Sequence, residues 1–147
     1  METTERMVFE LTSGGYLVIV HTFQEPSKEA WDRYVALCKE KKSEIRGFAV
    51  FTQGGGPDAK QRATAGEIWM DDLGKLPPTT VMTSSRLVRG IVTAMNWAGA
   101  KNVRAFPPHQ THDGLRHLGV PNEHVGEVLF CANRLLKQLN STMLLSA

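Results

Sequence analysis

Short apolar runs alternate along the chain with longer segments that have the period of an amphipathic helix. Residues 7–11 alternate apolar and polar positions, Gly14-Gly15 follows as a turn signal, and 16–20 is continuously apolar and β-rich. This opening predicts an antiparallel hairpin. Unbroken apolar runs are typical of parallel strands that are buried on both faces. We expect such strands at 48–51, 79–83 and 103–106.

Helices are predicted between these strands. The ranges are 27–42, with Ser27 as its cap, about 58–73, from 84 or 85 to Gly99, 113–118, and 122–139. Pro57 is expected in the first turn of the second helix, and Asn122 is expected to cap the last. In the third helix we expect Leu87, Val88, Ile91, Val92 and Met95 to face inward, with Gly90, Ala94 and Ala98 close to a neighbouring element. The order ββαβαβαβαα predicts an α/β sandwich on a mostly parallel sheet opened by the hairpin.

The length of 147 residues fits one domain, 1–147, in which 1–6 and 140–147 are expected to be flexible tails. Hydrophobic residues make up 41% and charged residues 22%, which excludes wholesale disorder and fibrous repeats. The net charge of +2 is too balanced for a dedicated nucleic-acid binder.

Cys38 and Cys131 have no CxxC spacing and are expected to be core residues of a reduced protein. With no apolar stretch long enough for a transmembrane segment, we expect a cytoplasmic location.

Polar loops follow three of the predicted parallel strands, and ligands of open α/β sheets collect at that edge. Glycine loops, helix N-termini and basic side chains together favour an anion or an acidic partner. The candidate residues are Gly54, Gly55, Gly56, Asp58, Lys60, Arg62, Ser84, Ser85, Arg86 and Arg89. The alternative is structural: the glycines allow a tight turn, the serines cap a helix, and the arginines are solvated or paired with Asp58 or Asp113.

Other chemistry has weaker support in the sequence. His109, His112 and His117 with Asp113 lack the second ligand pair of a strong metal signature, so we expect no metal site. GxSxG, P-loop and dinucleotide motifs are all absent, so we expect no cofactor and no enzymatic activity. His21 and His124 are expected to be peripheral polar residues. Trp31, Trp69 and Trp97 are expected in the core, although an exposed Trp69 or Met70 would anchor an interface, and a homodimer is one possibility.

The order of elements resembles the STAS domains of anti-sigma-factor antagonists and the related Sec14-like fold. The resemblance covers nearly the whole chain and rests on the strand 48–51, the loop 52–58, the segment 79–86 and the strand 103–106. The chain also looks like uncharacterised bacterial members with a Gly-Gly-Gly-Pro loop. In the antagonists, the loop after the buried strand carries a serine that a partner kinase phosphorylates. The loop 53–58 has no serine, so this switch is not carried over.

The resemblance implies a regulatory or scaffolding domain that binds a protein partner through the loops at the carboxyl edge of the sheet. The alternative is a small anionic ligand or a lipid headgroup bound at the same basic, glycine-rich edge. A deep apolar cavity behind the basic residues would favour the ligand, whereas a filled core and a flat surface would favour the protein.

Overall fold

The structure, a computed structural model, describes residues 5–69, 77–97, 102–143 and 145. In this part of the chain five strands form one sheet in the order β1-β2-β3-β4-β5, the same as their order in the chain. The first pair is antiparallel and all the others are parallel. The strands are β1 (Met7–Leu11), β2 (Tyr16–His21), β3 (Gly47–Thr52), β4 (Thr79–Met82) and β5 (Val103–Phe106). The predicted hairpin and the three later strands are therefore confirmed, but β5 is an edge strand with an exposed Arg104 and is not buried on both faces as expected.

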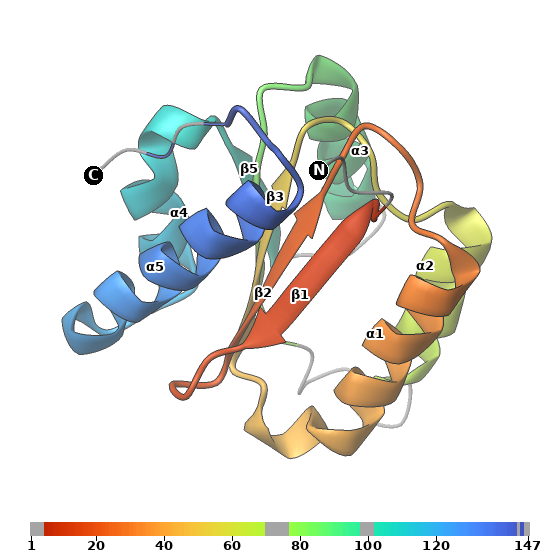
Figure 1. The fold of residues 1–147 in the computed structure, drawn as a ribbon, viewed down its shortest axis with the longest axis horizontal. Helices are drawn as coiled ribbons and strands as arrows, with labels where there is room; N and C mark the ends of the chain where they lie inside the picture. The colour runs from red at the N-terminus through yellow and green to blue at the C-terminus, as the bar shows by residue number, and fades with distance from the viewer. Residues whose placement is uncertain (1–4, 70–76, 98–101, 144, 146–147) are drawn as a thin grey trace.

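Helices cover both faces of the sheet (Figure 1). They are α1 (Lys28–Glu40), α2 (Ala59–Glu67), α3 (Arg86–Trp97), α4 (Thr111–His117) and α5 (Asn122–Gln138), with short 3-10 turns at Lys42–Glu44 and Pro108–Gln110. In Figure 1, α4 and α5 lie on one side of the sheet and α1 and α2 on the other. The expected α/β sandwich with a mostly parallel sheet is thus the observed fold.

The two faces of the sheet have separate cores because side chains alternate along each strand. Leu17 and Ile19 of β2 pack with Trp31 of α1 on one face. Val18 and Val20 point the other way and pack with α5, whose buried side chains include Val128 and Leu135. Met143 and Leu145, in the expected tail, are partly buried against this second core. Cys38 and Cys131 are free and buried, one in each core.

The third helix departs from the expected packing. Val92 is buried against Val81 and Val103, but Leu87 is 72% exposed and Ile91 40% exposed. A Cβ atom added to Gly90 would meet nothing within 4 Å, and Ala94 is exposed, while Ala98 lies outside the described residues. Val88, Val92 and Met95 pack beside Val81 and Val103 as expected, and Ile91 borders a cavity on the same face. The expectation is wrong for Leu87 and for the close neighbour at Gly90 and Ala94. The reason is position: α3 packs over β4 and β5 at the edge of the sheet, which is too narrow to cover its broad apolar face.

Three smaller expectations are corrected at helix ends and at Trp69. Asp58 is the N-cap of the second helix, and its carboxylate accepts the Gln61 N–H in a capping box, so Pro57 lies before the helix and not in its first turn. Pro121 takes the N-cap position of α5 with extended backbone, so Asn122 is the first helical residue and caps nothing. Trp69 is buried edge-on against Phe48, in a turn after the helix, and is a core residue. Met70 and the rest of the predicted helix to 73 lie outside the described residues.

Candidate functional site

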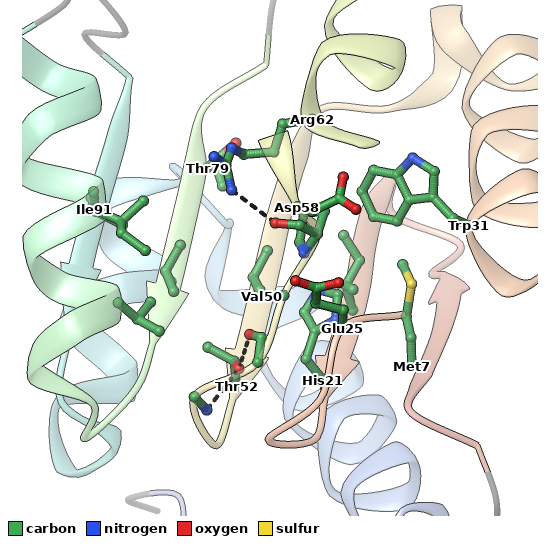
Figure 2. Close-up of a pocket in the computed structure, with 18 of the residues that line it drawn as sticks. Met7, His21, Glu25, Trp31, Val50, Thr52, Asp58, Arg62, Thr79 and Ile91 are labelled. Carbon is green, nitrogen blue, oxygen red and sulfur yellow. Dashed lines mark hydrogen bonds between the residues drawn. The ribbon is translucent and has the colours of Figure 1, made fainter. Parts of the chain in front are cut away.

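A cavity of about 630 Å³ lies on the sheet face that carries α1, α2 and α3 (Figure 2). Its floor is apolar and includes Ile19, Val50 and Val81 from three neighbouring parallel strands. Trp31 and Tyr34 of α1 line one side, and Val88, Ile91, Val92 and Met95 of α3 line the other. Figure 2 shows Trp31 and Ile91 on opposite sides of this space. Pockets of this size, with apolar walls and few polar groups, are typical of small-molecule sites.

The composition of α2 explains why the space between α1 and α3 is not filled. Residues 59–67 read AKQRATAGE, so the apolar side chains of this helix are no larger than a methyl group. No residue within α2 is buried. A helix that covers a sheet normally fills the layer between them with large apolar side chains. Without them, α2 leaves Val50 and Val81 uncovered enough to line a cavity.

Two loops close the end of the cavity at the carboxyl edge of the sheet. The Gly55 N–H donates to the Thr22 carbonyl at 2.8 Å, which ties the loop after β3 to the loop after β2. A Cβ atom on Gly55 would lie 2.3 Å from the Gln24 carbonyl oxygen, so only glycine allows this approach. The Gly54 N–H donates to Thr52 Oγ1 at 3.0 Å, and Gly54 has φ +145°. The glycine loop is therefore a fixed wall of the cavity.

Charged groups are few in the cavity lining: Glu25, Asp58 and Arg62. Asp58 Oδ1 accepts the Gln61 N–H at 2.7 Å, and the Arg62 guanidinium donates from Nη1 to the Pro57 carbonyl at 2.8 Å. The Trp31 indole N–H donates to the Gln61 carbonyl at 3.1 Å and so joins α1 to α2. Figure 2 shows the Glu25 and Asp58 carboxylates in the space between α3 and Trp31.

His21 also lines the cavity, at the carboxyl end of β2. It is 4% exposed, which corrects the expectation of a peripheral residue. Its Nδ1 is buried and has no hydrogen-bond partner in the described part of the chain. Burial lowers the pKa of His21 from 6.5 to about 4, so the ring is neutral near pH 7. A buried polar atom without a partner is costly unless something outside the chain satisfies it.

The candidate residues that were predicted from the sequence lie in different places in the structure. Gly54, Gly55, Gly56, Asp58 and Arg62 line the cavity. Ser84 and Ser85 line a smaller hollow of about 310 Å³ beside Phe23 and Met143. Ser85 Oγ also accepts the Val88 N–H at 3.2 Å, as expected of a helix cap.

The basic candidates do not gather in the cavity. Lys60, Arg86 and Arg89 are exposed and do not line it. Asp58 is engaged in its capping box, and Asp113 pairs with Arg116 at 3.2 Å, so neither carboxylate holds one of the candidate arginines. The anion site at these residues stays a prediction.

Two residues of the cavity lining, His21 and Glu25, were not among the predicted site residues, and the sequence held a signal for His21 alone. His21 follows Leu17 and Ile19 at intervals of two, which places all three on the same face of β2. A strand side chain in that series is expected to point inward. Glu25 lies in a polar loop, and nothing in its spacing indicates the cavity.

The histidines after β5 form no metal site among the residues that the structure describes. His117 Nε2 lies 3.3 Å from the Asn102 carbonyl oxygen, and His109 is exposed.

In comparisons with known proteins, no family model matches the chain, and no curated protein matches it in sequence. Among solved structures, an uncharacterised protein of the DUF3478 family from Shewanella loihica PV-4, described as having a SpoIIAA-like fold, superposes with a TM-score of 0.61. The two are 11% identical over 80% of this chain and 98% of that one. The anti-sigma factor antagonist SpoIIAA in its unphosphorylated form is also similar, with a TM-score of 0.46, 10% identity, and coverage of 78% of this chain and 99% of that one. No helix of the described residues is both long and apolar enough to cross a membrane. The fold of this chain is therefore SpoIIAA-like: an α/β sandwich on a mostly parallel sheet.

Proposed function

We propose that this chain is a non-enzymatic binding domain whose cavity takes a small molecule with a largely apolar body. The observation that carries the proposal is the cavity of about 630 Å³ with an apolar floor across β2, β3 and β4. An apolar cavity of this volume favours a ligand-binding domain over a purely protein-binding one, for which a filled core and a flat surface would be expected. Burial of an apolar ligand there stabilises the complex by about 25 cal/mol per Å² removed from water.

The geometry also limits the size and orientation of the ligand. The walls come from α1 and α3, and the glycine loop closes the carboxyl edge beside His21. A molecule of one or two fused rings fits a volume of this order. Its apolar body would lie on Val50 and Val81, with its polar end toward His21 and the glycine loop.

The test is binding of prodan, a neutral fluorophore whose emission rises and shifts in apolar surroundings. We expect saturable binding to the wild type and at least tenfold weaker binding to Val50→Phe, whose ring would occupy the floor of the cavity. Leu87→Phe is the matched control, since Leu87 is exposed on α3 outside the cavity lining. Circular dichroism would verify that both variants fold. Equal binding by the two variants, or no saturable binding by the wild type, would contradict the proposal.

A second candidate is an acidic protein partner at the carboxyl edge, as the sequence suggested. The observation that favours it is Phe23, which is 73% exposed in the loop after β2 and lies beside Ser84 and Ser85 in the smaller hollow. Exposed aromatic side chains are frequent anchors of protein interfaces. Arg86 and Arg89 are exposed at the start of the adjacent helix and would pair with acidic side chains. In this proposal the domain acts in the cytoplasm, where its free thiols stay reduced.

Affinity capture from host lysate tests this candidate. We expect a protein that the wild type retains and that both Arg86→Glu/Arg89→Glu and Phe23→Ser lose. Arg33→Glu/Lys39→Glu on α1 makes the same change in net charge on another surface and should retain it. Retention by Arg86→Glu/Arg89→Glu, or loss by the control, would exclude this surface.

A further inference from the structure

The polar end of the cavity has an excess of hydrogen-bond acceptors, and this excess restricts the ligand. The inference that follows rests on the proposed ligand-binding function. Glu25 and Asp58 place two carboxylates in the lining against the single guanidinium of Arg62. That guanidinium already donates to the Pro57 carbonyl, on its own loop. The lining is therefore net negative when His21 is neutral, and it repels a ligand anion.

Two of the three N–H groups in the glycine loop are already used within the chain. The Gly54 N–H donates to Thr52 Oγ1, and the Gly55 N–H donates to the Thr22 carbonyl. The Thr52 hydroxyl is also used, because it donates to the Gly55 carbonyl at 2.5 Å. The Asp58 N–H donates to the Gln61 side-chain oxygen. These internal hydrogen bonds leave the loop a poor binding site for phosphate or carboxylate.

His21 supplies a second, independent indication. Its buried Nδ1 has no partner in the described structure, although the ring lines the cavity. A neutral imidazole has one nitrogen that accepts a hydrogen bond and one that donates. Glu25, from the loop after the same strand, lines the same cavity and carries only acceptors when ionised. A ligand ammonium pairs with this carboxylate directly, and it would reach the buried His21 Nδ1 only if the ring turned toward the cavity.

Aromatic side chains complete the pattern. Trp31 and Tyr34 line the cavity from α1, and the Asp58 carboxylate lines the same cavity. A cation over an aromatic face is attracted by the quadrupole of the ring, whereas an anion is repelled. Carboxylates, a neutral histidine and aromatic faces are together complementary to an organic cation.

We propose that the cavity binds a small organic amine, with its apolar body on the sheet between α1 and α3 and its ammonium group toward Glu25, Asp58 and His21. The ammonium donates to the carboxylates, and the neutral His21 ring lies beside them without a competing charge. No covalent step is involved. The ligand is recognised by its positive charge and by its N–H donors, which match the carboxylate acceptors of the cavity.

The experiment compares three ligands with the same naphthyl body and different polar ends: 2-(1-naphthyl)ethylamine, 2-(1-naphthyl)ethanol and 1-naphthylacetate. Displacement of prodan from the wild type gives each affinity. We expect the amine to bind at least fivefold more tightly than the alcohol and at least tenfold more tightly than the acid. Added salt should reduce the preference for the amine.

Variants then assign the preference to the named groups. Glu25→Gln/Asp58→Asn removes both carboxylates, and asparagine retains the helix cap at position 58. This variant should bind the alcohol within twofold of the wild type and lose the preference for the amine. Glu40→Gln, an exposed carboxylate on α1 outside the cavity lining, is the matched control and should keep it. The amine should also shift the His21 ring nitrogen resonances more than the alcohol does.

The outcomes separate the two proposals. If the alcohol or the acid binds as tightly as the amine, or if Glu25→Gln/Asp58→Asn keeps the preference, the amine proposal is overturned while the cavity remains a ligand site. The same holds if prodan binds and none of the three ligands displaces it. If prodan itself does not bind, the cavity is not a ligand site, and both proposals fail.

Discussion

His21 lies at the end of β2, and burial is the effect that lowers the pKa of its ring. Met7 and Trp31 line the same cavity, and the ring is almost completely buried. Burial lowers its pKa from 6.5 to about 4, because the charged ring would lose its hydration. The unfolded chain has no such restriction and takes up the proton near pH 6.5. Folding is therefore linked to the ionisation of this one residue.

This linkage predicts that the free energy of unfolding falls as the pH decreases from 6.5 toward 4. In that interval the unfolded state binds the proton and the folded state does not, so stability rises with pH. A pKa difference of about 2.5 corresponds to a total effect on the order of 3 kcal/mol. Urea unfolding at pH 7 and pH 4.5 measures it. His21→Leu should flatten the dependence, and His109→Asn, at an exposed site, should not. An unchanged slope in His21→Leu would contradict the prediction.

At the scale of secondary-structure elements, the cavity depends on how the loop between β3 and α2 is fixed. Gly55 packs against the backbone of the preceding loop, with a virtual Cβ atom 2.3 Å from one carbonyl oxygen and 2.5 Å from another. Backbone atoms cannot move aside as a flexible side chain can. Gly56, the next residue, has open space around its Cα atom. The two adjacent glycines therefore have different structural roles.

We expect Gly55→Ala to destabilise the fold by about 1–3 kcal/mol, the usual effect of inserting atoms into a packed site. The same change should weaken prodan binding, because the loop is a wall of the cavity. Gly56→Ala is the control and should change stability by no more than about 0.5 kcal/mol. Thermal unfolding and prodan titration of the two variants provide the measurement. Equal stability of the two alanine variants would show that the loop is free to move.

Most helices and strands could be predicted from the sequence, because the pattern of apolar and polar residues in each matches its burial in the fold. The run 48–51 is apolar throughout, and the strand it predicts is buried between parallel neighbours. The same reasoning failed for α3, because periodicity identifies an apolar face but not the width of the surface that receives it. Leu87 remains exposed for that reason, whereas Ile91 is partly exposed because it lines the cavity. The cavity was also missed, although the lack of large apolar residues in 59–67 was visible in the sequence.

At the scale of the whole molecule, the candidate site lies between the sheet and the helices on one of its two faces. The strand order equals the chain order, so the strand sequence does not reverse to create the crevice where open α/β sheets usually bind ligands. The cavity lies instead on the face of the sheet, where α2 fails to fill the space between α1 and α3. The carboxyl-edge loops were predicted correctly as neighbours, but the space behind them depends on three-dimensional packing.

The same strand order has a consequence for synthesis on the ribosome. Each of β2 to β5 pairs with the strand that precedes it in the chain, so the sheet can be extended strand by strand as the polypeptide emerges. The core over Val18, Val20 and Phe51 is different, because residues 122–138 complete it. Until α5 has been translated, the part of that face over β1 and β2 has no cover and is available to chaperones or to other nascent chains.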